Sequence, residues 1–338
     1  MHSKIFTLAY IVQLCLGCSS SVQVDLNDSQ EMNETTPLFE RGHEDKVTDR
    51  YPLMVSYDFG ETWESASGDL PPAMQVSFLE PKGLELVLAS DNMGVFISSQ
   101  NKSTWKAIGN NLPNQKINAL TVVGDEIYVG VYQSGIFRTT DDGQTWEALN
   151  FDLPNLNVLS ILQIDQQLIA GTDAGIYTLD AHTESWKRTN AQSQTLSLYE
   201  FDNILIAGTS QGTLISTNGG MHWEWIRQEG SVHYTHNIGK RIVELALNGD
   251  LVYSDDWGAS WTKTQYEPRA SAYVYEIIEC GDFQLLSNNY GIHRSTDYGA
   301  TWELIFKTES MVFLDLIPIE NEIYGGTRIW DEFRNRTK

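Results

Sequence analysis

A tryptophan recurs through most of this chain at intervals of 37 to 42 residues. Each one closes a short motif rich in Ser, Thr, Asp and Gly, and apolar runs flank the motif on both sides. A fixed period of about forty residues indicates a repeat architecture in which every repeat is one supersecondary unit. The recurring tryptophans are Trp63, Trp105, Trp146, Trp186, Trp223, Trp261 and Trp302.

The motif reads Ser-x-Asp-x-Gly-x-Thr-Trp in its fullest copies, at residues 56–63 and 295–302. This pattern resembles the Asp-box, or bacterial-neuraminidase (BNR), repeat. The copies that end at Trp105 and Trp186 have Gln100 and Ala181 at the acidic position, so we expect their turns to be less regular. The other five copies keep an acid or its amide, namely Asp58, Asp141, Asn218, Asp256 and Asp297.

The residue types of the motif suit a tight turn between two strands. A carboxylate can accept backbone N–H groups inside the turn, and glycine supplies a positive φ angle. The tryptophan can then pack beneath the turn. A calcium site is the alternative for such acidic motifs, but the acids lack the ligand number and spacing of a calcium loop. We therefore expect structural acids, no metal and no cofactor.

Each repeat also contains two short apolar strands before its motif, for example residues 158–162 and 168–170. With the two strands that flank the motif, this gives four strands, called a to d in chain order, which is the size of a propeller blade. The chain enters at the c strand 53–55 and ends with the apolar runs 312–319 and 322–324, which no motif follows. We therefore predict an all-β, seven-bladed propeller over residues 51–338, closed by N-terminal and C-terminal half-blades.

The first residues are typical of an export signal. Residues 1–17 combine one basic residue with an apolar run that is too short to span a bilayer. The run ends at Leu16-Gly17-Cys18, which resembles a bacterial lipoprotein box, with ordinary signal cleavage as the alternative. The resemblance implies lipidation of Cys18 and a place in a bacterial cell envelope, at the outer membrane or cell surface. Residues 18–50 are polar and acidic, as expected of a flexible tether.

The charge of the chain excludes some partners. It has 22 Lys+Arg against 45 Asp+Glu, a formal net charge of -23. Nucleic-acid binding needs a basic surface, and so does electrostatic docking on anionic lipid. Contact with a membrane is therefore expected through the lipid anchor only. The third cysteine, Cys280, follows an apolar run and is expected to end a strand.

In this topology the b–c turns and d–a connections share one face of the ring. The turns carry polar and aromatic side chains without a cationic cluster, and these could grip a sugar ring or a partner protein; ordinary surface aromatics are the alternative. The candidate binding residues are Tyr132, Tyr290, Arg328 and Trp330. His233 and His236 invite a metal interpretation, but on a strand this spacing sends the two side chains to opposite faces.

Fold alone does not select a function among Asp-box propellers. The chain lacks the arginine trio and the Arg-Ile-Pro-like motif that resemblance to sialidases would require. A single exported, lipid-anchored ring looks most like the photosystem II assembly and stability factor type, whose members are binding scaffolds; the acidic charge departs from that type. We expect a non-catalytic scaffold that binds a protein or glycan. The alternative is a glycan-active, glycoside hydrolase-like enzyme or its accessory, which would need converging carboxylates in the centre of the ring.

Overall fold

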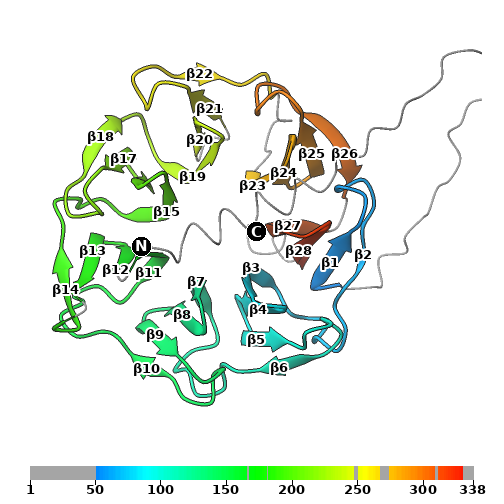
Figure 1. The fold of residues 1–338 in the computed structure, drawn as a ribbon, viewed down its shortest axis with the longest axis horizontal. Coiled ribbons are helices and arrows are strands. Elements are labelled where there is room, and N and C mark those ends of the chain that lie inside the picture. Colours follow the sequence, from blue (N-terminus) through cyan, green and yellow to red (C-terminus); the bar gives the residue numbers. More distant parts are fainter. Residues whose placement is uncertain are drawn as a thin grey trace, which may run out of the picture.

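The computed structural model describes residues 51–165, 167–180, 182–246, 250–266, 274–308 and 311–329. These residues form seven four-stranded antiparallel sheets that surround a common axis (Figure 1). The predicted seven-bladed propeller is thereby confirmed. Strand a lies nearest the axis in each blade and strand d at the circumference.

The first three blades follow the order of the chain. Their strands are β3 (Val76–Lys82), β4 (Glu85–Ser90), β5 (Gly94–Ser98) and β6 (Trp105–Ala107) in blade 1; β7 (Ile117–Val123), β8 (Glu126–Val131), β9 (Gly135–Thr139) and β10 (Glu147–Ala148) in blade 2; β11 (Val158–Ile164), β12 (Gln167–Thr172), β13 (Gly175–Asp180) and β14 (Ser185–Arg188) in blade 3.

The next three blades repeat this arrangement. Their strands are β15 (Thr195–Phe201), β16 (Ile204–Thr209), β17 (Gly212–Ser216) and β18 (Glu224–Arg227) in blade 4; β19 (Val232–Ile238), β20 (Arg241–Ala246), β21 (Leu251–Ser254) and β22 (Thr262–Lys263) in blade 5; β23 (Val274–Cys280), β24 (Phe283–Asn288), β25 (Gly291–Ser295) and β26 (Glu303–Lys307) in blade 6.

Blade 7 joins the two ends of the described chain, as the sequence predicts. Its inner strands are β27 (Met311–Ile319) and β28 (Glu322–Ile329), and its outer strands are β1 (Leu53–Ser56) and β2 (Glu64–Ser65). Leu53 pairs with Gly326 and Ser56 with Ile323 across the closing ladder. This pairing leaves neither β28 nor β1 as an open sheet edge.

The core lies between neighbouring blades. Strand b has a blade on each side, and its residues are accordingly buried in a continuous run: five of six in β4, β8 and β12. Each hydrophobic cluster therefore combines residues of adjacent blades, such as Val87 of β4 with Ile127 of β8. The d strands are short and mostly exposed because only one edge of each is paired.

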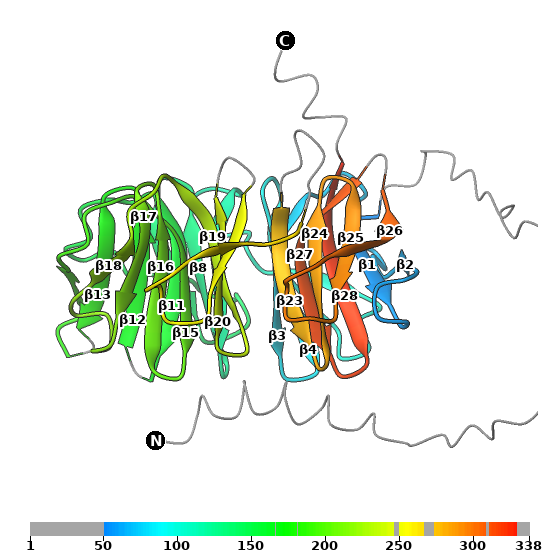
Figure 2. The same ribbon diagram turned by 90° about the horizontal axis from the view of Figure 1, so that it is seen from above.

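The two faces of the disc carry different turns (Figure 2). The a–b and c–d turns lie on one, which we call the repeat-turn face because the Trp motifs form its c–d turns. The b–c turns and d–a connections lie on the other, which we call the rim face. Strand β1 begins at the rim face, and Thr327 of β28 donates its amide to the Pro52 carbonyl there at 2.9 Å. The described chain thus begins at the rim face.

A β-bulge interrupts every innermost strand near its rim-face end. In β23, for example, Val274 pairs with Asn288 and Glu276 with Ser287, so Tyr275 is the extra residue. The same shift occurs in β3, β7, β11, β15, β19 and β27. A bulge changes which side chains share a face of the strand. The residues after the seven bulges therefore form one level of the ring: Phe78, Ala119, Ser160, Ser197, Tyr234, Glu276 and Asp315.

Candidate functional site

The acids of the Trp motifs are bound within their own turns, which we call the repeat turns. The Asp297 carboxylate accepts the Ser295 hydroxyl at 2.8 Å, and the amide and hydroxyl of Thr301 at 2.8 and 2.7 Å. The Gly299 amide donates to the Ser295 hydroxyl oxygen at 2.8 Å. Equivalent bonds hold Asp58, Asp141, Asn218 and Asp256.

These bonds stabilise the ionised form of the acids. The amide and hydroxyl of Thr145, together with the Thr139 hydroxyl, hold the pKa of Asp141 below its ordinary value of 3.8. In the turn of blade 5, Trp261 donates its indole N–H to the Gly258 carbonyl at 3.1 Å. Gly258 has a φ of 89°, and an added Cβ would lie 2.7 Å from Ile226 of the neighbouring blade. The motif is thus used for turn geometry and blade packing.

The two divergent turns are stabilised by other residues. In blade 1, Asn101 accepts the hydroxyls of Ser99 and Ser103 at 2.7 and 2.8 Å, one position later than the usual acid. In blade 3, Asp180 accepts the His182 amide at 3.0 Å and pairs with Lys187 at 2.5 Å. The Lys187 ammonium is the main cause that lowers the pKa of Asp180 to about 2. Asn101 and Asp180 each lie one position away from the acidic position of the motif, so the motif pattern does not identify them.

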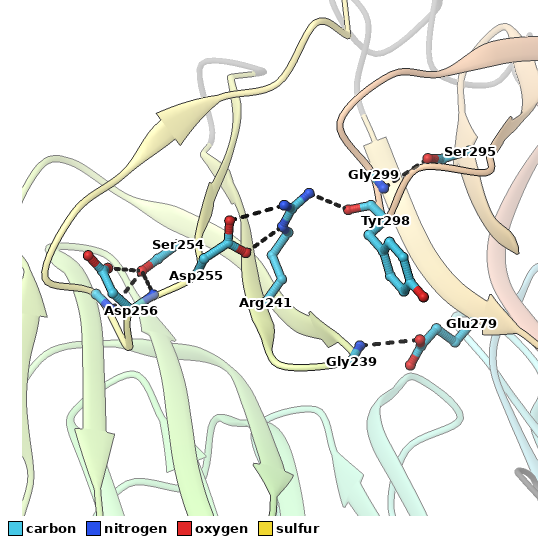
Figure 3. Close-up of polar contacts among 10 residues, drawn as sticks. Gly239, Arg241, Ser254, Asp255, Asp256, Glu279, Ser295, Tyr298 and Gly299 are labelled. Carbon is cyan, nitrogen blue, oxygen red and sulfur yellow. Dashed lines mark hydrogen bonds and ion pairs between the residues drawn. The ribbon is translucent and has the colours of Figure 1, made fainter. Parts of the chain in front are cut away.

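Basic side chains of one blade hold the repeat turn of the next. Arg241 of β20 pairs with Asp255 at 2.7 Å and donates to the Tyr298 carbonyl in the turn of blade 6 at 2.7 Å (Figure 3). Arg294 of β25 likewise donates to the Phe59 carbonyl in the turn of blade 7 at 3.1 Å. Arg138, Arg227, Arg241 and Arg294 all form ion pairs on strands b to d, away from the innermost strands.

On the rim face the structure brings two of the predicted binding residues into one network. Arg328, at the end of β28, donates to the Asp91 carboxylate in the b–c turn of blade 1. Asp91 also pairs with Lys116 at 3.5 Å, and the Lys116 ammonium lies 4.7 Å from the ring centroid of Tyr132 in blade 2. We call Arg328, Asp91, Lys116 and Tyr132 the rim network. It spans three blades, and its two cations share the single Asp91 carboxylate.

The other predicted rim residues lie apart from this network or outside the description. Tyr290 is in the b–c turn of blade 6, where its amide donates to Asn288 at 2.7 Å and its carbonyl accepts from Thr308 at 2.9 Å. Its neighbour Gly291 has a φ of 144°, and a Cβ there would lie 1.8 Å from the Phe306 carbonyl oxygen. Trp330 and Cys18 lie outside the described residues.

A second polar arc continues around the rim face over blades 2 to 4. Asn118 donates to Asn157 at 3.2 Å, Asn157 donates to Asp173, and Gln194 donates to the same carboxylate at 2.6 Å. Only Asp173 of this arc lies in a b–c turn; Asn157 and Gln194 lie in d–a connections. Because d–a connections carry no recurring motif, the sequence offered no signal for these two residues.

Titratable side chains from five innermost strands gather about halfway along the axis. We call them the axial cluster: Tyr199 of β15, Tyr234 and His236 of β19, Glu276 of β23, Asp315 of β27 and Glu80 of β3. The Tyr234 hydroxyl donates to the Glu276 carboxylate. The His236 ring lies 4.7 Å from that of Tyr199 and 6.0 Å from that of Tyr234. Asp315 accepts the Leu79 amide of blade 1 at 2.6 Å.

The environment of the axial cluster favours uncharged side chains. Burial, and then the Asp315 carboxylate, raises the pKa of Glu80 to about 8 and holds that of Glu276 well above its ordinary value. Burial raises the pKa of Asp315 to about 7 and lowers that of His236 to about 4. All six side chains nevertheless keep partial exposure, so solvent reaches them.

Acids in the centre of the ring were expected only for the alternative enzymatic function, and no residue of the axial cluster other than His236 was singled out in the sequence. The available signal was an acid that interrupts an apolar inner strand, as in Val274–Cys280 and Met311–Ile319. His233 is the exposed bulge residue of β19, whereas His236 is in the axial cluster, so the two do not share a site. No metal-binding group of three or more His, Cys, Asp or Glu occurs within the described ranges.

Two further findings concern the rest of the chain. Cys280 lies buried at the end of β23, where the sequence places it. Among the residues that the structure describes, no helix has the length and apolar character needed to cross a membrane.

Solved structures share the fold of this chain at low sequence identity. YCF48 bound to a D1 peptide is 16% identical, with a TM-score of 0.60, and the match covers 75% of this chain and 92% of that one. The extracellular domain of BT4673 from B. thetaiotaomicron is 15% identical, with a TM-score of 0.62 and coverages of 75% and 37%. An ancestral GH74 enzyme is 19% identical, with a TM-score of 0.56 and coverages of 72% and 40%.

No protein-family model matches the sequence, and no curated protein matches it. The structural similarities show the propeller fold alone, because fold at such identities does not transfer an activity. The chain is therefore similar in architecture both to a peptide-bound propeller and to a glycoside hydrolase propeller, and its site residues must decide between binding and catalysis.

Proposed function

We propose that this chain is a non-catalytic binding propeller of the Asp-box type, and that it presents its rim face to a protein or glycan partner. The observation that carries the proposal is the rim network. Asp91 holds Arg328 and Lys116, and Lys116 lies against Tyr132, so a guanidinium, an ammonium and an aromatic ring are linked in a fixed order before a partner arrives. Such preorganisation reduces the entropy lost on binding.

The repeat turns support a structural interpretation of the motif acids. Their carboxylate oxygens are already occupied by hydroxyls and amides of the same turn, as in Asp256 with Ser254 and Ser260. An acid committed to turn geometry is not available for acid–base chemistry. The peptide-bound state of YCF48 shows that a ring of this architecture can act as a binding scaffold in another protein.

We further propose that the protein is exported and lipid-anchored through Cys18 at the outer membrane or cell surface of a bacterium. The support for the anchor is the apolar run that ends at Leu16-Gly17-Cys18. Cys18→Ala should move the protein from the membrane fraction to the soluble envelope fraction. Unchanged fractionation, with no acyl mass on the wild-type chain, would contradict the anchor.

The binding proposal is tested with the full chain on a glycan array and in a pull-down from envelope extract. Tyr132→Ala and Asp91→Ala should each lower the affinity for the captured ligand at least tenfold, and the circular dichroism spectrum should stay unchanged. Tyr57→Ala is the matched control, because Tyr57 is an exposed aromatic residue in a repeat turn on the opposite face. Equal loss in the control would place the binding surface elsewhere.

The alternative glycan-active enzyme has one observation in its favour, which is the convergence of Glu80, Glu276 and Asp315 near the axis. A glycosidase uses one protonated and one ionised carboxyl group. Here the pKa of all three groups is shifted in the same direction, and Glu276 and Asp315 already accept hydrogen bonds from the protein. Release of reducing ends from plant or algal polysaccharides, abolished by Glu276→Gln, would establish the enzyme instead.

A further inference from the structure

The three carboxyl groups of the axial cluster have no basic partner in the described part of the chain. The groups that shift the pKa of Glu80, Glu276 and Asp315 include carboxyls, a tyrosine and backbone amides, but no Lys or Arg. Lys82, at the end of the innermost strand β3, pairs with Asp142 in the repeat turn of blade 2. Arg138, Arg227, Arg241 and Arg294 form their ion pairs on outer strands and turns, and Lys116 forms its pair at the rim. Carboxyl groups gathered in a protein interior are ordinarily paired with a cation.

A buried serine adds a second, independent observation. Ser287 of β24 is 0% exposed, and its Oγ has no hydrogen-bond partner within the protein. It stands directly opposite Glu276 in the β23–β24 ladder, so both side chains lie on the same face of blade 6. The Nδ1 atom of His236 is likewise buried without a partner. Ser287 and His236 can both accept a hydrogen bond, as the neighbouring carboxylates do.

The remaining members of the axial cluster provide aromatic faces. The Tyr234 and His236 rings are stacked with an interplanar angle of 16°, and Tyr199 meets His236 edge to face. Aromatic rings beside carboxylates are the combination that recognises organic ammonium and guanidinium ions. The carboxyl groups are not arranged as a joint metal-ligand set in the described residues, which favours an organic cation over a metal ion.

The residues at this level of the ring are partly open to solvent. Six of the seven residues that follow the bulges remain partly exposed, namely Phe78, Ser160, Ser197, Tyr234, Glu276 and Asp315. The chain as a whole has a net charge of -23, which attracts cations toward the ring. Both the access and the long-range field therefore suit a small positive group.

We propose that the axial cluster binds a primary ammonium or guanidinium group between Glu276, Asp315 and the Tyr234–His236 rings. The ion pairs with the carboxylates, donates to Ser287 and lies against the aromatic faces. This inference is independent of the rim network, since the rim residues can be changed without touching the axis. The cation can come from a free polyamine or from a Lys or Arg side chain of a peptide.

Release of protons when the cation binds distinguishes binding at the axial cluster from binding elsewhere on the chain. Glu80, Glu276 and Asp315 hold protons more tightly than ordinary carboxyls, and a bound cation favours their ionised form. The other titratable groups around them are Tyr199, Tyr234, His236, Glu200 and Glu279. Tyr199 and Tyr234 stay protonated at neutral pH, because burial raises the pKa of both further above 10.0. Protons released on binding must therefore come from carboxyl groups.

The test is titration calorimetry of the full chain with spermidine and with a Gly-Lys-Gly peptide that is acetylated at its N-terminus and amidated at its C-terminus. The equally blocked peptide with norleucine in place of lysine has no ammonium group and serves as the neutral comparison. Measurements at pH 7 in two buffers of different ionisation enthalpy count the protons released. We expect saturable binding of one cation per chain with net proton release, and no binding of the norleucine peptide. Preference for the lysine peptide would identify a partner side chain as the source, and preference for spermidine a free amine.

Variants locate the site. Glu276→Gln and Asp315→Asn should each weaken binding at least tenfold and reduce the proton release. The control Glu303→Gln removes the same charge from exposed β26 of the same blade and should leave both unchanged. Ser287→Ala and Tyr234→Phe, which are smaller changes, keep the test valid if an acid variant fails to fold. Unaltered binding in these axial variants, or equal loss in Glu303→Gln, would overturn the proposal.

Discussion

At the scale of single residues, carboxyl groups occur in two different environments, the repeat turns and the axial cluster. Acids of the repeat turns are ionised and bound by nearby hydroxyls and amides, as Asp297 is by Ser295 and Thr301. Acids near the axis are only partly exposed, and burial raises their pKa values. The sequence presents both as one acidic composition, but their contributions to stability respond oppositely to pH.

The repeat-turn acids should matter for folding rather than for a ligand. Asp297→Ala removes the acceptor for two hydroxyls and one amide, and we expect a loss of about 1–3 kcal/mol in the free energy of unfolding. Asn101→Ala should also be destabilising because Asn101 substitutes for the acid in blade 1, whereas Gln100→Ala should have little effect. Urea denaturation of the three variants measures this order. An unaffected Asp297→Ala would contradict the structural role.

At the scale of elements, neighbouring blades are joined by side chains that reach across the interface. The most buried such pair is Arg227 of β18 with Glu244 of β20, at 2.7 Å. The Glu244 side chain is 0% exposed and that of Arg227 only 15%. Burial raises the pKa of Glu244, against the opposing effects of the Thr213 hydroxyl and the Arg227 guanidinium. A buried ion pair therefore contributes to the packing of blade 4 against blade 5.

Breaking this pair should be far more costly than breaking an exposed one. Arg227→Met leaves a buried carboxyl group without its cation, and we expect a loss of about 3–5 kcal/mol in unfolding free energy. The loss should shrink at acidic pH, where Glu244 is protonated, and in the double variant with Glu244→Met. The control Arg138→Met breaks the exposed pair with Glu147 within blade 2 and should cost about 1 kcal/mol or less. Thermal and urea denaturation distinguish these outcomes.

At the scale of the whole molecule, the acids near the axis make the ring sensitive to pH. The folded state raises the pKa of Glu80 from 4.5 to about 8, so it binds a proton that the unfolded chain has released over this range. Stability from this group is complete below pH 4.5 and is lost as the pH rises toward 8. The repeat-turn acids, such as Asp141, have lowered pKa values and lose their contribution as the pH falls below 3.8.

We therefore predict that the free energy of unfolding is greatest at mildly acidic pH. It should fall on the order of 1–3 kcal/mol between pH 5 and pH 8 as the axial carboxyl groups ionise. Glu80→Gln should flatten this part of the profile, since the amide does not titrate. Exposed Asp125→Asn, at an a–b turn, should leave it unchanged. Urea denaturation from pH 4 to pH 8 gives the profile, and a rise in stability toward pH 8 would contradict the prediction.

Predictions from the sequence succeeded where the determinants are local. Each repeat turn is stabilised by bonds within about eight residues of chain, and so a motif such as Ser295–Trp302 is sufficient to identify it. The spacing of the tryptophans gives the size of a blade, and the half-blades at the two ends give seven of them with closure. The sequence also placed Tyr132 and Arg328 on the same face, because strand order fixes which turns share an end of the ring.

Tertiary structure alone decided which distant side chains meet. Arg328 reaches Asp91 across 237 positions of chain, and Asp315 accepts the Leu79 amide across 236. Such contacts depend on closure of the ring and on the bulge in each inner strand, which changes the face that every following side chain occupies. A one-residue shift is invisible in an apolar run such as Val274–Cys280. The turns and the blade count are therefore encoded locally, whereas the axial cluster exists only once seven blades are brought into register around one axis.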